Sequence, residues 1–157
     1  MDDVYMQEAI AQALHAKEKN EVPIGAVIVF KDEVIATGYN VRETVQSTLS
    51  HAELIAIQEA NEKIGSWRLE DCTLYVTLEP CPMCAGAIVQ SRIKRVVFGA
   101  FDPKAGCAGS LMNLLNDNRF NHQVELTTGV MEKECSQLLT NFFQKLRMRK
   151  RNGRKTE

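Results

Sequence analysis

The sequence of 157 residues has no apolar run long enough to cross a membrane, since its longest one extends only from Ile24 to Phe30, whereas a spanning helix needs about 20 residues. Met1 is followed by two aspartates and by no apolar stretch, so we expect no secretory signal. The five cysteines are odd in number and lack the spacing of a disulfide framework. We therefore expect a cytoplasmic protein whose reduced cysteines bind metal or take part in chemistry.

The net charge of −1 gives no sign of nucleic-acid binding, but this charge is unevenly distributed. Residues 1–144 contain 12 Lys and Arg against 19 Asp and Glu, which gives −7, and residues 145–157 contain seven against one, which gives +6. We expect an acidic body with a basic, disordered tail over residues 150–157 that can follow phosphates. The basic residues near this end are Lys145, Arg147, Arg149, Lys150, Arg151, Arg154 and Lys155.

Hydrophobic periodicity predicts helices that alternate with short buried strands. The predicted helices cover residues 3–19, 51–64 and 82–91 and begin again near 131, with a short one over 111–115; the predicted strands cover residues 24–30, 34–39, 73–78, 95–100 and 124–128. This alternation predicts one α/β domain over residues 1–149, a three-layer α/β/α sandwich around a five-stranded mixed sheet. In the last helix, we expect apolar residues at helical spacing to join the core: Leu138, Leu139, Phe142, Phe143 and Leu146.

A Cys-x-x-Cys pair lies between a predicted strand and a predicted helix. Pro82 restricts Cys81 to an extended conformation and suits the first helical position, so Cys81 is expected at the N-cap, with Cys84 in the first turn. Both sulfurs then lie at the positive end of the helix, which favours thiolates. Two thiolates at this spacing make half of a tetrahedral zinc site.

Three kinds of site contain such a pair. A structural zinc site needs four protein ligands, but the sequence has no second Cys-x-x-Cys and no His-x-x-x-His. A redox pair needs no further partner. A catalytic zinc site needs three ligands and one open position, and His51, at the start of another predicted helix, can be the third. Glu53, two residues further on, is then placed to transfer protons to and from an activated water.

His-x-Glu followed by Pro-Cys-x-x-Cys is the signature of zinc-dependent nucleobase deaminases, which have a cytidine deaminase-like fold. The likeness extends beyond this signature, because residues 21–26, 65–69, 80–88 and 102–115 closely resemble bacterial tRNA-specific adenosine deaminases. It covers most of the chain, from about Met6 to Arg149. The resemblance implies hydrolysis of adenosine to inosine at the wobble position of a tRNA anticodon, in bacteria usually that of the arginine tRNA with anticodon ACG.

The same resemblance assigns roles to individual residues. It implies one Zn²⁺ per subunit, held by His51, Cys81 and Cys84, with Glu53 as the proton shuttle. It also implies a homodimer whose RNA site lies near the subunit interface. The residues that it places at the substrate are Asn40, Ile24 and Ala52 around the purine, and Asp102, Lys104, Phe143 and Arg147 near the flanking anticodon nucleotides.

Two other functions share part of this pattern. A deaminase of a free base, nucleoside or nucleotide would use the same zinc site but would not need the basic tail. A non-catalytic, zinc-stabilised RNA-binding protein would need neither an open coordination position nor Glu53. Assays on free nucleosides and on an anticodon stem-loop distinguish these alternatives.

Overall fold

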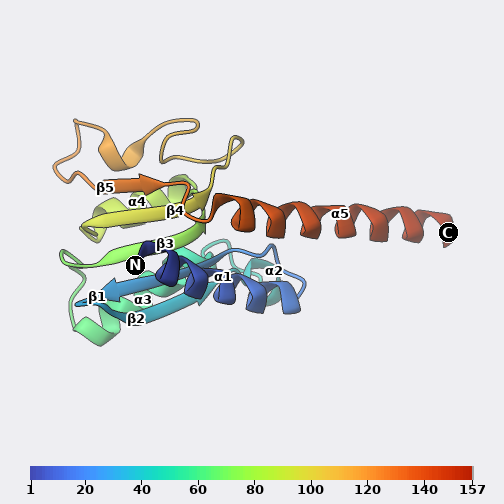
Figure 1. The fold of residues 1–157 in the computed structure, drawn as a ribbon, viewed down its shortest axis with the longest axis horizontal. Helices are drawn as coiled ribbons and strands as arrows, with labels where there is room; N and C mark the ends of the chain where they lie inside the picture. Colours follow the sequence, from blue (N-terminus) through green and yellow to red (C-terminus); the bar gives the residue numbers. More distant parts are fainter. Residues whose placement is uncertain (157) are drawn as a thin grey trace.

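The computed structural model describes residues 1–156, and five strands form one sheet within it in the order β2-β1-β3-β4-β5 (Figure 1). The elements in chain order are α1 (Asp2–Glu18), β1 (Gly25–Phe30), β2 (Glu33–Tyr39), α2 (Arg42–Val45), α3 (Ala52–Ile64), β3 (Thr73–Leu78), α4 (Pro82–Gln90), β4 (Arg95–Ala100), the 3₁₀ turn η1 (Leu114–Asn116), β5 (Glu125–Thr128) and α5 (Glu132–Thr156). Among the described residues, no helix is both long and apolar enough to span a membrane.

The sheet is mixed, as the sequence predicts. β1 pairs antiparallel with β2 and with β3, whereas β3, β4 and β5 run parallel to one another. Parallel neighbours need a crossover connection, and α4 supplies it between β3 and β4. The carboxyl ends of β3 and β4 therefore lie at the same edge of the sheet, where open α/β sheets bind ligands.

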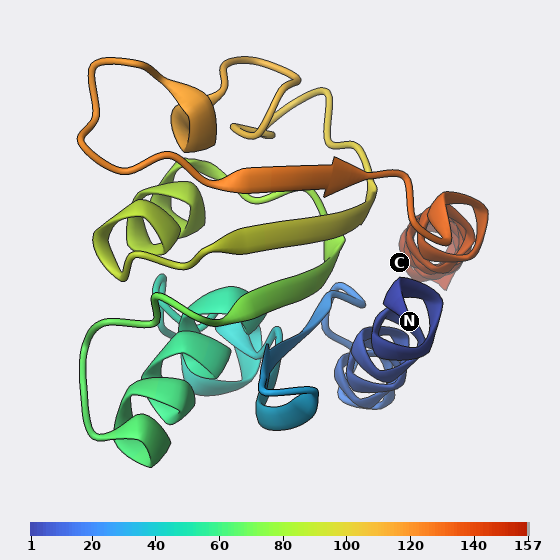
Figure 2. The same ribbon diagram turned by 60° about the vertical axis from the view of Figure 1, so that its left-hand side comes forward.

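Helices cover both faces of the sheet, so the predicted α/β/α sandwich is confirmed. Figure 2 shows α1 and α5 on one side of the strands and α3 and α4 on the other. Alternate residues of β1 point to opposite layers: Val27 and Val29 pack with α1, while Ala26 and Ile28 pack with α3 and α4. This alternation of buried side chains is the period-two pattern of a strand that is covered on both faces.

Glycine lets the helices approach the sheet closely at two positions. A Cβ atom on Gly25 would lie 2.1 Å from the carbonyl oxygen of Ala9 in α1, and one on Gly38 would lie 2.2 Å from that of Ala52 in α3. Because neither position has room for a side chain, both helix backbones rest on the strands. The contact at Gly38 fixes the first turn of α3, which carries the candidate site residues.

The apolar residues of α5 are not in the core of this chain, contrary to the sequence-based prediction. Cys135 is buried, but Leu138, Leu139, Phe142 and Leu146 are only half-buried, and Phe143 is 40% exposed. α5 begins against the sheet and then extends well beyond it (Figure 1). The apolar stripe therefore continues past the layer against which it could pack.

Two predicted irregular segments contain helix. The segment 150–157 was expected to be a disordered tail, but α5 continues without a break to Thr156; Glu157 lies outside the described residues. The predicted loop over residues 40–50 contains the short helix α2. The other predicted helices and strands are present, with boundaries that differ by a few residues at most.

Candidate metal centre and active site

Two helix N-termini meet at the carboxyl edge of the sheet. His51 is the N-cap residue of α3 and Cys81 is that of α4, both in extended conformation. Pro82 occupies the first helical position of α4, as its missing N–H allows. The amide of Ala85 donates to the carbonyl oxygen of Cys81 at 2.8 Å, which places Cys84 in the first turn. The predicted capping geometry of the Cys-x-x-Cys pair is thus confirmed.

The three predicted ligands form one cluster. Nδ1 of His51 lies 3.6 Å from Sγ of Cys81 and 3.5 Å from Sγ of Cys84, and all three candidate ligand atoms lie within 4.8 Å of one another. A tetrahedral zinc ion, with Zn–S of about 2.3 Å and Zn–N of about 2.0–2.1 Å, separates nitrogen from sulfur by about 3.5–3.6 Å. The cluster therefore fits a zinc ion in donor type and in spacing, with one coordination position left over.

The negative charge of the cluster lies on one sulfur, that of Cys81, and not on both cysteines as the sequence predicts. Hydrogen bonds from Cys84 and His51 lower the pKa of Cys81 to about 4, and the hydrogen bond with Cys81 raises the pKa of His51. The hydrogen bond to Cys81 raises the pKa of Cys84, and burial adds to this shift. A thiolate thus holds its neighbours' protons in place, and a bound metal ion would displace them.

Glu53 lies in the first turn of α3, beside this cluster. Its side chain is 5% exposed, and burial raises the pKa of its carboxyl group to about 7, with a further contribution from the negative charge of Cys81. A carboxyl group in this environment exists in both protonation states near neutral pH. Such a group can take up and release a proton during one reaction cycle.

A cavity of about 450 Å³ opens over the cluster and is large enough for a purine nucleoside. His51, Glu53 and Cys81 line it together with six of the seven predicted substrate residues, namely Ile24, Asn40, Ala52, Asp102, Lys104 and Phe143. Arg147 does not line the cavity; it lies on the exposed surface of α5, one turn beyond Phe143. The structure thus brings the metal cluster and the predicted purine-binding residues into one pocket.

Two hydrogen bonds with backbone groups hold the side chain of Asn40 in place. Its amide Nδ2 donates to the carbonyl oxygen of Val22 at 3.2 Å, and its Oδ1 accepts from the backbone N–H of Arg42 at 3.1 Å. A side-chain amide has two donors and two acceptor positions, so one donor and one acceptor position remain for a ligand. This fixed orientation is what recognition of a polar edge requires.

Glu21, which the sequence did not single out, holds the loop that leads to His51. It is 2% exposed and accepts hydrogen bonds from the backbone N–H groups of Glu43 and Thr44 and from the Thr44 hydroxyl. Burial alone would raise the pKa of Glu21, but these hydrogen bonds outweigh it and hold the pKa below its ordinary value. The carboxylate thus caps α2 and secures the wall of the pocket that contains Asn40.

The sequence did not single out Glu79 either. This residue holds the loop on the opposite wall of the pocket, as Glu21 holds the loop that leads to His51. It is 2% exposed and accepts hydrogen bonds from the backbone of Asp102, Ala108 and Ser110 and from the Ser110 hydroxyl. Burial raises its pKa, but these hydrogen bonds outweigh it and lower the pKa overall. Only the position of Glu79 between a buried strand and Cys81 could have signalled a role.

An α/β/α sandwich with a His/Cys/Cys cluster and a buried glutamate at facing helix N-termini defines a deaminase of the cytidine deaminase-like class. Comparison with known proteins agrees. A profile of MafB19-like deaminases matches residues 1–147. The tRNA-specific adenosine deaminase of Bacillus subtilis (strain 168) is 59% identical over 154 residues, which are 98% of this chain and 96% of that protein.

Solved structures agree with this assignment. A structure from work on A-to-I editing by tRNA:A34 deaminases superimposes with a TM-score of 0.83 at 40% identity, over 86% of this chain and 98% of that one. This chain belongs to the family of tRNA-specific adenosine deaminases, and it is an enzyme. The guanine deaminase of Nitrosomonas europaea shares the fold, with a TM-score of 0.77 at 21% identity over 89% of this chain and 83% of that one.

Proposed function

We propose that this chain hydrolyses adenosine to inosine at the wobble position of a tRNA anticodon, with the arginine tRNA of anticodon ACG as its substrate. The observation that carries the proposal is the pocket of about 450 Å³, in which a zinc-type cluster and the buried Glu53 lie beside residues suited to hold a purine. The relatives named tRNA-specific adenosine deaminase support RNA, rather than a free nucleoside, as the substrate.

The cofactor of this proposal is one Zn²⁺ per subunit, held by His51, Cys81 and Cys84. When bound, it supplies a strongly polarised water molecule near neutral pH. Glu53 accepts a proton from this water and delivers it to purine N1 while the water oxygen bonds to C6. Glu53 then moves the remaining proton of that water from the oxygen on C6 to the exocyclic amino group, so that the C6–N bond breaks, a C6 carbonyl forms and ammonia leaves. Water and adenosine are consumed, and inosine and ammonia are formed.

The target base must leave its stack to reach the pocket, which costs least in a single-stranded loop. Phe143, 40% exposed at the pocket, offers an aromatic face on which a neighbouring base can stack. Lys104, also at the pocket, and the basic residues along α5 offer cations for the phosphates on either side. These features favour a polynucleotide over a free nucleoside.

The proposal includes a homodimer in the cytoplasm. Leu111 and Met112 are more than half exposed on the loop that follows β4, as are Val45 and Leu49 on the segment between β2 and α3. Such apolar residues, together with the half-buried stripe of α5, offer surface that a second copy can bury. Sedimentation of the purified chain tests this part, and a monomer at micromolar concentration would contradict it.

The decisive experiment incubates the zinc-loaded protein with an ACG anticodon stem-loop and measures inosine by nuclease digestion and mass spectrometry. Free adenosine, cytidine and guanine are assayed in parallel, and a stem-loop with guanosine at the wobble position is the matched control. We expect inosine only in the ACG stem-loop. Turnover of a free base or nucleoside without inosine in the stem-loop would favour the alternative function.

A further inference from the structure

The carboxylate of Glu79 is fully occupied by one loop. Oε1 accepts from the backbone N–H of Asp102 at 3.0 Å and from the Ser110 hydroxyl, while Oε2 accepts from the backbone N–H groups of Ala108 at 3.1 Å and Ser110 at 2.9 Å. Each oxygen therefore receives two hydrogen bonds, which uses the lone pairs of a carboxylate. No acceptor capacity is left for a proton of the substrate, although the residue borders the pocket.

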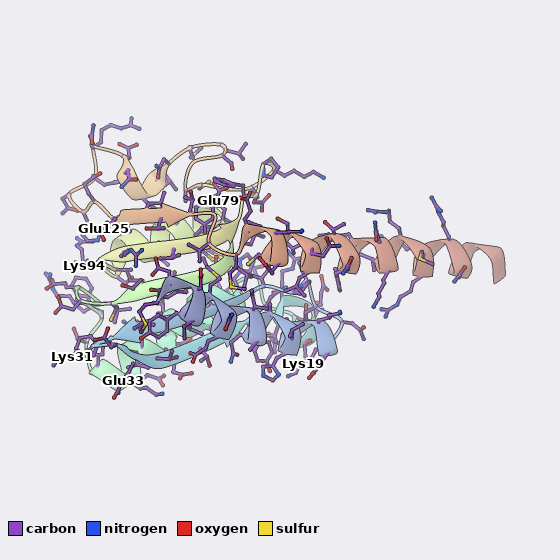
Figure 3. All side chains as sticks on the ribbon, in the orientation of Figure 1. Lys19, Lys31, Glu33, Glu79, Lys94 and Glu125 are labelled. Carbon is purple, nitrogen blue, oxygen red and sulfur yellow. The ribbon has the colours of Figure 1, made fainter. Side chains whose placement is uncertain are left out.

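The loop over residues 101–111 closes tightly around this carboxylate. A Cβ atom on Gly106 would lie 2.2 Å from the carboxylate carbon of Glu79, so only glycine fits there. The backbone N–H of Cys107 donates to the carbonyl oxygen of Pro80 at 2.8 Å, which joins the loop to the segment that carries Cys81. In Figure 3, Glu79 lies toward the end of the sheet from which α5 projects.

The hydrogen bonds of Glu79 continue through Asp102 to the rim of the pocket, which is formed by Asp102, Lys104 and Ala105. Glu79 holds the N–H of Asp102, and Oδ1 of Asp102 in turn accepts from the N–H groups of Lys104 and Ala105, each at 3.1 Å. Asp102, Lys104 and Ala105 all line the pocket, and Lys104 is exposed. This rim is therefore in reach of the nucleotides on either side of a base that enters the pocket.

We propose that Glu79 is a positioning residue that fixes the 101–111 loop for the nucleotides that flank the target adenosine, and that it sets substrate affinity and flanking-nucleotide discrimination rather than turnover. The inference rests on the function proposed above. It differs from the role of Glu53, because Glu79 acts through the loop and not on the reacting atoms.

The test compares steady-state kinetics of the wild-type chain and E79Q on the ACG stem-loop. Glutamine keeps the size of the side chain but turns an NH₂ group toward two donors of the loop, so it breaks two of the four hydrogen bonds. We expect KM to rise roughly ten-fold, as for loss of hydrogen bonds to a charged group, with kcat within about three-fold and zinc content unchanged. Replacing a nucleotide beside the target adenosine should cost E79Q less than it costs the wild type.

Two further variants separate the loop from the metal site and from general stability. G106A pushes a methyl group against the same carboxylate from the loop side and leaves the strand before Cys81 unaltered, so it should reproduce the KM effect. D2N removes a carboxylate that accepts from Tyr75 at 2.7 Å and pairs with Arg95 at 2.7 Å, away from the residues that line the pocket. It should lower the melting temperature and leave KM unchanged.

Unchanged KM and unchanged discrimination in both E79Q and G106A would overturn the positioning role. Loss of zinc, or a fall in kcat with KM unchanged, would also overturn it and would assign Glu79 to support of the metal cluster. If E79Q is recovered unfolded, S110A, which removes one hydroxyl donor from the same carboxylate, provides the measurement. A wild-type chain that forms no inosine in the stem-loop would instead contradict the proposed function.

Discussion

Glu53 and Glu79 are both buried carboxylates near Cys81, yet their protonation equilibria are shifted in opposite directions. Burial raises the pKa of Glu53 to about 7, whereas four hydrogen bonds from one loop lower the pKa of Glu79 despite its burial. The number of donors decides the difference, since donors stabilise the charged form and desolvation disfavours it. Glu53, which must take up and release protons, has few hydrogen-bond donors around its carboxylate. Glu79, which must hold a loop, accepts a hydrogen bond at each of its lone-pair positions.

The largest expected effect is that of E53Q. This variant should lower kcat, whereas E79Q should raise KM. The amide keeps the shape of the side chain but cannot exchange a proton, so we expect kcat to fall by about 10²–10⁴-fold or more. Zinc content by elemental analysis and the melting temperature should remain those of the wild type. Single-turnover deamination by E53Q at close to the wild-type rate would remove the distinction between the two glutamates.

The cysteines permit the same kind of comparison. C84A removes one of three clustered ligand atoms and should abolish both stoichiometric zinc and activity. C107A is the matched control, because Cys107 is also buried and lies on the 101–111 loop but is not in the cluster. It should keep zinc. Full zinc occupancy in C84A would contradict its assignment as a ligand.

A smaller effect is expected from substitutions at the basic end of α5. Like E79Q, they should weaken the affinity for the RNA rather than lower kcat. K150Q/R151Q keeps Arg147 and the part of α5 that reaches the pocket. We expect the slope of log affinity for tRNA against log salt to become shallower by about 0.7–0.9 for each phosphate contact that is lost. K31Q/K94Q is the control at the opposite end of the molecule (Figure 3). Equal slopes in the two double variants would exclude Lys150 and Arg151 from the RNA contact.

The smallest effect concerns Asp2, a third hydrogen-bonded carboxylate, which is remote from the pocket. The Arg95 guanidinium beside Asp2 holds the pKa of that carboxyl below its ordinary value of 3.8. A depressed pKa contributes stability above the unfolded-state value, and this contribution is lost as the pH falls through the folded-state value. D2N should therefore be less stable than the wild type at pH 7 by about 1 kcal/mol. Urea denaturation should show this gap closing below pH 3.8; a constant gap would contradict the ion pair.

Much of the fold and the metal cluster could be predicted because their causes are local. Apolar periodicity marks the strands and helices, and Pro82 between Cys81 and Cys84 fixes an N-cap from sequence alone. The stripe of α5 was misinterpreted because periodicity reports an apolar face and not what covers it. The helix begins against the sheet and then extends beyond it, so the side chains of the stripe are at most half-buried within this chain.

The loop-holding glutamates could not be predicted, because their partners are distant and unmarked. Glu21 accepts from backbone groups more than 20 residues away, and so does Glu79. Every residue other than proline has a backbone N–H, so no residue type in the partner loop identifies it as a donor. Only the fold brings these donors together. For the same reason, the residues that hold the two walls of the pocket can be recognised in the structure but not from sequence motifs.

Because α5 is long, it separates the basic end of this chain from its acidic body in space. Its 25 residues span about 37 Å and extend away from the sheet (Figure 1). Residues 1–144 carry −7 and residues 145–151 on α5 carry +5, so the two charges are separated along the long axis of the molecule and form an electric dipole. The field of a polyanion exerts a torque on such a dipole and turns its positive end forward before contact. A protein with almost no net charge can therefore approach RNA already oriented.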